Sequence, residues 1–179
     1  MPSEILPDVF RWSEYSPAHK VELASHAVWN GRRLLVFDPI AFPRDLELPG
    51  GHGDLILLTN ENHVRAASTW SADRHLPVWC APEASVELPG VRRWGPEEDP
   101  TPDWIRIPLP GGPGGETAFF DPTRSLMVFG DAVVNLAGCG LEILPDKYCT
   151  DPVRLRKSLR KLPPFVHAVF AHGDPLIGG

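Results

Sequence analysis

Short runs of apolar residues, separated by turns rich in proline and glycine, dominate the pattern of this chain. Residues 9–12 and 21–29 are predicted to be two strands, and the Asn30-Gly31 pair that follows favours a type I′ hairpin. Residues 34–37 then return as a fully apolar third strand. The first part of the chain is therefore predicted to be an antiparallel β-meander and not a βαβ unit.

The next apolar run differs because a helical pattern follows it. Leu55 to Leu58 is short and continuous, which is typical of a strand buried on both faces. Thr59 ends that strand, and a helix is predicted from Val64 to Trp70. Open α/β sheets usually bind ligands at the carboxyl ends of such strands. The pattern therefore predicts a site among the polar residues that follow this strand: Asn60, Asn62, His63 and Arg65.

The second half of the chain is predicted to contain more strands and one further helix. Asp151 and Pro152 are good N-cap and first-turn residues for a helix that runs to about Lys161. The glycines of the 111–115 loop predict a backbone that lies close to another segment, since glycine tolerates approaches that other residues do not. The strands are predicted at residues 77–81, 104–107, 117–120, 126–129 and 165–170.

Composition limits the classes of partner. The 179 residues suit one domain that spans residues 1–179, and 17 Lys and Arg against 23 Asp and Glu leave a net charge of −6. An acidic chain without a basic tract or a long apolar run is not expected to bind nucleic acid or to enter a membrane. The amino terminus lacks the features of a signal peptide, so a cytoplasmic location is predicted. The cysteines are odd in number and widely spaced, which favours reduced structural thiols: Cys80, Cys139 and Cys149.

Five segments stand in a recognisable order along the chain: Phe37-Asp38-Pro39, residues 59–65, the glycine-rich residues 109–117, Phe129-Gly130-Asp131-Ala132, and residues 170–175 with His172. Taken in this order, they resemble the motifs of the metallo-β-lactamase superfamily. The resemblance implies an α+β fold, a four-layer αββα sandwich of two mixed β-sheets flanked by helices. Family members often continue past the closing histidine with another helix, whereas this sequence ends at Gly179.

The metal ligands that this resemblance implies are mostly missing. Laid on Thr59, the family's His-x-His-x-Asp-His motif would place its ligands at Asn60, Asn62, Val64 and Arg65. Gly112 stands where the family's loop has a ligand histidine, whereas Asp131 and His172 match the family. Amide oxygens are poor zinc ligands beside imidazole, glycine has no ligand, and a guanidinium is always charged. A dinuclear metal site of the usual kind is therefore nearly excluded.

Our first hypothesis is a protein that functions without metal. Arg65 would supply part of the positive charge that metal supplies in the relatives, and it would pair with Asp131 beside His172. No cofactor is expected on this hypothesis, and the chain would be a non-hydrolytic member with a binding or structural role.

The alternative hypothesis is an enzyme, a metallo-β-lactamase-like hydrolase with an atypical single-metal site. His63, Asp131 and His172 would form a set of two histidines and one carboxylate that suits zinc. A third interpretation is an interaction module that forms a homodimer through a tryptophan-rich surface. A small-molecule ligand is compatible with the first two hypotheses.

The predicted pocket also includes residues outside the 59–65 segment. Glu116 is predicted to line the pocket beside the glycine loop. An equal alternative is that Glu116 is a solvated carboxylate of the hairpin. Asp38 is interpreted as a turn carboxylate, and His26 as a structural residue with satisfied hydrogen bonds. The full set of predicted pocket residues is Asn60, Asn62, His63, Arg65, Gly112, Glu116, Asp131 and His172.

Overall fold

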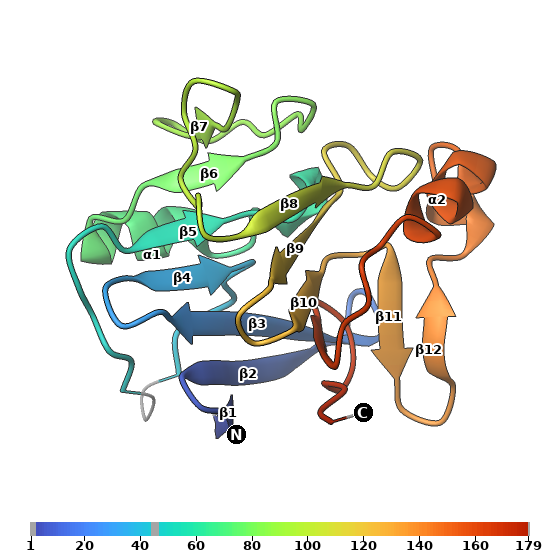
Figure 1. The fold of residues 1–179 in the computed structure, drawn as a ribbon, viewed down its shortest axis with the longest axis horizontal. Coiled ribbons are helices and arrows are strands. Elements are labelled where there is room, and N and C mark those ends of the chain that lie inside the picture. The colour runs from blue at the N-terminus through green and yellow to red at the C-terminus, as the bar shows by residue number, and fades with distance from the viewer. Residues whose placement is uncertain (1–2, 44–46, 179) are drawn as a thin grey trace.

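The predicted β-meander is confirmed, and it begins the larger of two sheets (Figure 1). The computed structural model describes residues 3–43 and 47–178. Among these residues the first sheet has seven strands in chain order; its first four are antiparallel, and the later ones pair in parallel. They are β1 Ser3–Leu6, β2 Val9–Ser16, β3 Val21–Trp29, β4 Leu34–Phe37, β5 Leu55–Leu57, β6 Val78–Cys80 and β7 Arg92–Arg93.

The second sheet contains the predicted hairpin over residues 117–129. The carboxylate of Asp121 accepts the backbone N–H of Thr123 in the turn, as a turn aspartate does. The strand order is β13-β10-β9-β8, and β13 runs parallel to β10. These strands are β8 Ile105–Pro108, β9 Thr117–Asp121, β10 Leu126–Phe129 and β13 His167–Phe170, and a separate two-stranded ribbon consists of β11 Val133–Leu136 and β12 Gly140–Ile143.

Both predicted helices are present, with shifted ends. Helix α1 spans Ala67–Arg74 and begins later than predicted, because Arg65 has a φ of 41° that interrupts the helical path. Helix α2 spans Pro152–Leu159, and its predicted N-cap is confirmed: the Asp151 carboxylate accepts the backbone N–H of Arg154 at 2.9 Å. Neither helix, nor any other among the described residues, is long and apolar enough to cross a membrane.

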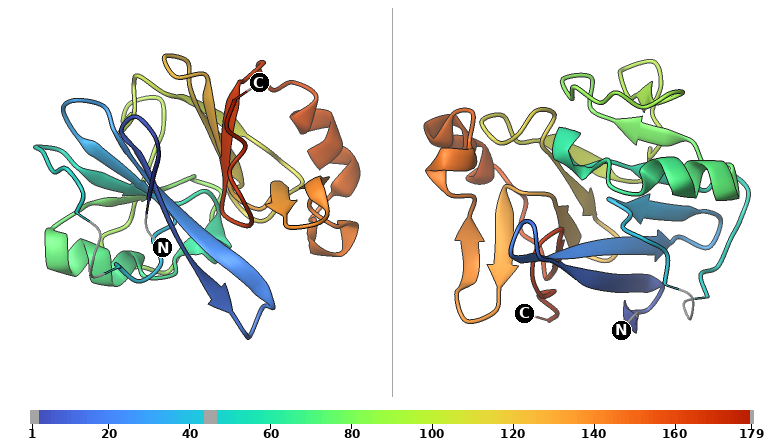
Figure 2. Two further views of the ribbon diagram at one scale, coloured as in Figure 1. Left: turned by 90° about the horizontal axis from the view of Figure 1, so that it is seen from below. Right: turned by 180° about the vertical axis from the view of Figure 1, so that it is seen from behind.

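The two sheets pack face to face, and one helix covers each outer face (Figure 2). Phe37 of the first sheet meets Phe119 of the second with ring centroids 5.3 Å apart. On the outer side of the first sheet, Trp70 of α1 stacks on Trp12 at 5.5 Å. Leu155 of α2 is buried in a second apolar cluster with residues of the other sheet. The molecule is therefore the predicted four-layer αββα sandwich, held together by two apolar cores.

The close backbone approach predicted for the glycine-rich loop is also present. Gly111 has a φ of 104°, and a Cβ built on it would collide with the backbone oxygen of Asp151, at the start of α2. The Asp151 N–H in turn donates to the Gly111 carbonyl at 3.1 Å. This loop thus connects α2 directly to the second sheet.

Replacing Gly111 with alanine is expected to lower the free energy of unfolding by more than about 2 kcal/mol, because backbone strain and a steric clash add. Gly138→Ala is the matched control: its φ is 82°, but no atom lies within 4 Å of the position that its Cβ would take. The control is expected to cost about 1 kcal/mol. Urea unfolding measures both, and equal losses would contradict the role of the contact with α2.

Candidate functional site

The parallel pairing of β4 and β5 creates the base of the site. Phe37 is paired with Leu57, so the residues that follow both strands meet at one edge of the sheet. There the Asp38 carboxylate accepts the backbone N–H of Thr59 at 2.8 Å and its hydroxyl at 2.6 Å. Asp38 is only 2% exposed. It is therefore a buried acceptor that joins the ends of β4 and β5, and the predicted turn carboxylate is wrong.

A tight 3₁₀ turn then selects which side chain enters the site. The side chain of Asn60 caps the turn Glu61–His63 by accepting the backbone N–H of Asn62 at 2.9 Å. Three residues complete one turn of a 3₁₀ helix, so residues 60 and 63 lie on the same side. His63 is consequently buried, whereas Asn62 is exposed and lies outside the group of buried site residues.

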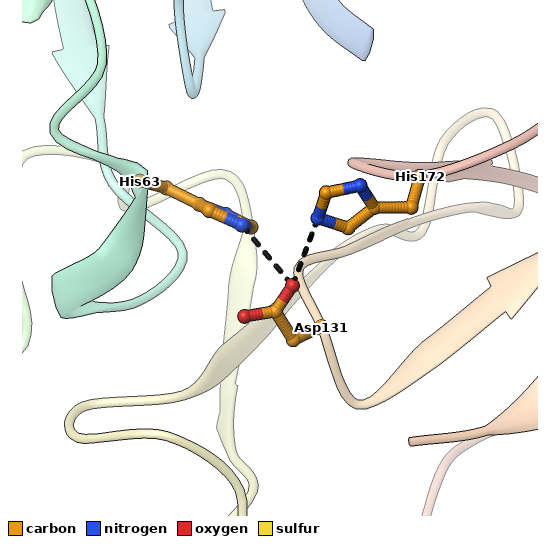
Figure 3. A group of neighbouring side chains, drawn as sticks. All are labelled: His63, Asp131 and His172. Atoms are coloured by element: carbon orange, nitrogen blue, oxygen red, sulfur yellow. Dashed lines mark hydrogen bonds and ion pairs between the residues drawn. The ribbon is translucent and has the colours of Figure 1, made fainter. Parts of the chain in front are cut away.

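Three side chains from separate parts of the chain converge at the centre of the site (Figure 3). Asp131 follows β10 and His172 follows β13, and the parallel pairing of these strands brings both residues to the same edge. The Oδ1 atom of Asp131 lies 3.1 Å from His63 Nε2 and 3.0 Å from His172 Nε2. One ligand atom from each of the three residues lies within 4.8 Å of the others.

Both imidazoles are oriented by a partner on their other nitrogen. His63 Nδ1 donates to Asp38 Oδ2 at 2.8 Å, and His172 Nδ1 lies 3.2 Å from the carbonyl oxygen of Glu22. Each Nε2 atom is thereby directed at Asp131. The side chain of His172 is 15% exposed, so the group opens toward solvent on its side.

Glu116 forms a second layer behind Asp131. Its two oxygens accept the backbone N–H of Ala132 at 2.8 Å and the side-chain amide of Asn60 at 2.7 Å. At 4% exposure Glu116 is buried, so of the two interpretations the solvated hairpin carboxylate is wrong. Gly112 makes room for it, because a Cβ at Gly112 would lie 2.9 Å from the Glu116 Cγ.

The charges in the site are strongly coupled. Burial opposes the charged form of His63, but the carboxylates of Asp38 and Asp131 outweigh it and raise the pKa of His63 to about 9. The same imidazole, together with His172, holds the pKa of Asp131 well below its usual range. Burial, with the Asp131 charge, raises the pKa of Glu116 to about 8. At neutral pH His63 is therefore protonated and lies between the carboxylates of Asp38 and Asp131, while Glu116 is neutral.

Known structures share this architecture, although no family model and no curated protein sequence matches the chain. The metallo-β-lactamase DIM-1 superposes with a TM-score of 0.72 at 13% identity, over 99% of this chain and 91% of its own. A metallo-β-lactamase from Erythrobacter litoralis gives 0.74 at 12% identity, over 98% and 90%. The protein TTHA1623, in a di-iron-bound form, gives 0.61 at 21% identity, over 98% and 93%.

This chain has the metallo-β-lactamase fold. The likeness covers nearly the whole chain, so the two-sheet architecture expected from the ordered motifs is confirmed. At these identities it establishes the fold alone, and the chemistry has to be argued from the side chains of this chain.

Within this metallo-β-lactamase fold, Arg65 does not lie where we predicted. Its guanidinium donates to the carbonyl oxygens of Ala24 at 2.8 Å and Asp38 at 3.1 Å, and it reaches that of Ala171 at 3.4 Å. No ion pair among the described residues joins Arg65 to Asp131, so that predicted pair is wrong. The guanidinium thereby connects β3 with the residues that follow β4 and β13.

His26 also differs from its prediction. It is buried on β3, but its Nε2 atom has no hydrogen-bond partner among the described atoms, so it is not the satisfied residue we expected. Burial and the nearby charge of Arg11 lower the pKa of His26 to about 3. His26 is therefore a neutral residue beneath the site.

Asp38 is the site residue whose role the sequence prediction missed. A signal was available, since Asp38 and Thr59 each follow a strongly apolar strand, as ligand-binding residues of α/β sheets do. What the pattern lacked was the information that these two strands are parallel neighbours.

Proposed function

We propose that this protein binds one divalent transition metal ion through His63, Asp131 and His172, and that it is a hydrolase with this single-metal centre. The observation that supports the proposal is the convergence of three ligand atoms, one from each residue, within 4.8 Å. Two histidines and one carboxylate are a common ligand set of catalytic zinc and of non-haem iron.

Two of the three distances between the donor atoms are close to those of ligands that share one metal ion. Ligand atoms that each lie about 2.1 Å from one ion, roughly at right angles, are about 3 Å apart. The two imidazole nitrogens lie 3.1 and 3.0 Å from the Asp131 oxygen. The carboxylate of Asp38 and the Glu22 carbonyl supply the outer hydrogen bonds that usually orient ligand histidines.

The residues of the chain have separate roles in this proposal. A bound metal ion would lower the pKa of a coordinated water molecule and polarise the substrate. Asp38 keeps the Nδ1 proton of His63, which leaves Nε2 as the ligand atom once its own proton is released. The side-chain amide of Asn60 donates to the Oδ2 atom of Asp131 at 3.0 Å, so the Oδ1 atom of Asp131 faces the two histidines.

The second candidate is a metal-free member with a binding role, and the charge balance of the site favours it. With a pKa of about 9, His63 is protonated at neutral pH and neutralises charge between Asp38 and Asp131. On this hypothesis the imidazolium, and not Arg65 as first predicted, takes the place of a cation. The two candidates differ in one measurable quantity, the metal content.

Freshly purified protein is expected to contain close to one transition metal ion per chain, measured by elemental analysis. His172→Gln is expected to weaken metal affinity at least about 100-fold, because it removes one of three ligands. His52→Gln is the matched control, since His52 is exposed and lies outside the site. Zinc-, iron- and manganese-reloaded samples, assayed against a panel of ester, amide and phosphate substrates, then test for hydrolysis.

Less than one ion in ten chains, before and after incubation with these metals, would decide for the metal-free candidate. Metal that binds equally well to wild type and to His172→Gln would show that the ion lies elsewhere.

A further inference from the structure

Arg11 on β2 holds the closing segment, residues 171–174, which carries His172. The Nη2 atom of Arg11 donates to the carbonyl oxygen of Gly173 at 3.0 Å and to the carboxylate of Glu22 at 3.1 Å. The backbone carbonyl of Glu22 is, in turn, the partner of His172 Nδ1 at 3.2 Å. One nitrogen atom of Arg11 therefore contacts the residue that follows His172 and the residue that orients its imidazole.

The closing segment is held from two sides. On the side of the first sheet, the Ala24 N–H donates to the Ala171 carbonyl at 2.9 Å, before His172, and Arg11 bonds to the segment after His172. On the side of the ribbon, the Asn135 N–H donates to the carbonyl of His172 at 3.2 Å. The backbone of β3 therefore holds one end of the segment, whereas the other end is linked to the first sheet through the side chain of Arg11.

This arrangement determines which nitrogen of His172 faces Asp131. A carbonyl oxygen can only accept, so the contact with Glu22 places a proton on Nδ1 and leaves Nε2 directed at Asp131, 3.0 Å away. The contact joins a side chain of the closing segment to the backbone of β3, so it persists only while the two stay at this distance. Arg11 maintains that distance, since its Nη2 atom bonds to both.

We propose that Arg11 is a positioning residue for His172: by bonding to Glu22 and Gly173 through one nitrogen, it keeps the imidazole with Nδ1 on the Glu22 carbonyl and Nε2 toward Asp131. The consequence for metal affinity rests on the proposed function, whereas the orientation of the imidazole does not. The two are therefore measured separately.

Arg11→Met is the direct test, because methionine keeps a long apolar side chain and removes the donors. The exchange of ring N–H protons with water is followed by NMR in metal-free protein with isotope-labelled histidine rings. The signals of His172 are those that His172→Gln lacks. The Nδ1–H of His172 is expected to exchange at least about 10-fold faster in Arg11→Met than in wild type, because its bond to Glu22 opens more often.

The same variant tests the consequence for metal. Zinc affinity, measured by competition with a chromophoric chelator, is expected to fall about 10–100-fold in Arg11→Met, since His172 loses its fixed orientation. Equal zinc affinity in wild type and Arg11→Met would overturn the proposal. If wild type binds no zinc, the proposed function fails, and the exchange measurement alone decides on Arg11.

Arg124→Met is the matched control. The guanidinium of Arg124 also joins a carboxylate and a backbone carbonyl, those of Asp121 at 2.8 Å and Trp29 at 2.9 Å. Arg124 lies in the turn before β10, at the opposite end of this strand from the site. The control is expected to lose stability as Arg11→Met does, and to keep the wild-type exchange rate at His172 and the wild-type zinc affinity.

An unchanged exchange rate in Arg11→Met would overturn the proposal, as would an equal increase in Arg124→Met, because lost stability alone would then explain both. If Arg11→Met does not fold, Glu22→Ala provides the result. It removes one partner of Arg11 through a side chain that is 39% exposed, so the fold is expected to persist. Faster exchange of the His172 Nδ1–H in Glu22→Ala supports the proposal, and the wild-type rate overturns it.

Discussion

Asp38→Ala is expected to unfold with a free energy about 3–5 kcal/mol lower than that of the wild type. The Asp38 carboxylate is the acceptor for two donors of Thr59 and for the Nδ1–H of His63, all of them buried. Removing it leaves these donors without a partner, and it leaves the imidazolium with one carboxylate instead of two. Urea unfolding of metal-free protein at neutral pH measures the loss.

Asp54→Ala is the matched control for this prediction. The Asp54 carboxylate also accepts backbone N–H groups, those of Leu34 and Gly51, but no imidazole in the described part of the chain bonds to it. Its replacement is expected to cost about 1–2 kcal/mol. If the two variants lose equal stability, Asp38 is an ordinary turn acceptor, as the sequence first suggested. Asp38→Ala should in addition reduce metal affinity about 10–100-fold, since His63 loses the partner that orients it.

The metal-free protein is expected to lose stability as the pH rises from about 6.5 to about 9, a range in which His26 is neutral in both the folded and the unfolded state. His63 has a folded-state pKa of about 9 against an ordinary value of 6.5, so its contribution is fully present below about 6.5 and is lost as the pH rises through 9. This shift corresponds to about 3 kcal/mol. Glu116 acts in the same direction, because its pKa is raised from 4.5 to about 8 and the folded protein retains the proton.

Thermal melts between these pH values, with a chelator present, measure the profile. His63→Gln is expected to flatten the part of the profile above about pH 6.5, while His52→Gln, on an exposed loop residue, leaves it unchanged. A wild-type profile that is flat or rises over this interval would contradict a protonated His63 between Asp38 and Asp131. Because metal binding displaces the Nε2 proton, metal affinity should increase over the same interval.

Local signals were sufficient for the elements whose ends are marked by turn or capping residues. The meander, the hairpin at Asp121 and the start of α2 at Asp151 follow from such signals. The strands that we did not predict are short or exposed. Every residue of β12 is exposed, for example, and only its pairing with β11 distinguishes it from a loop.

The candidate site residues also divide into those that the sequence predicted and those that only the tertiary structure placed. Asp131 and His172 were placed at the site by their sequence segments, and both lie there. Asn62 and Arg65, which occupy ligand positions of the family motif, are directed elsewhere. Sequence spacing could not predict this, because it depends on a 3₁₀ turn and on a positive φ, two features of the backbone that a single sequence does not show.

The sequence by itself determined the sandwich fold, since the fold depends on which residues are present and in what order. Only the tertiary structure decided that His63 is a central residue of the site, that Asp38 orients it, and that Asn60 separates Glu116 from Asp131. The physical reason is that these contacts join strand ends far apart in the chain, and parallel pairing of β4 with β5 and of β10 with β13 brings those ends together.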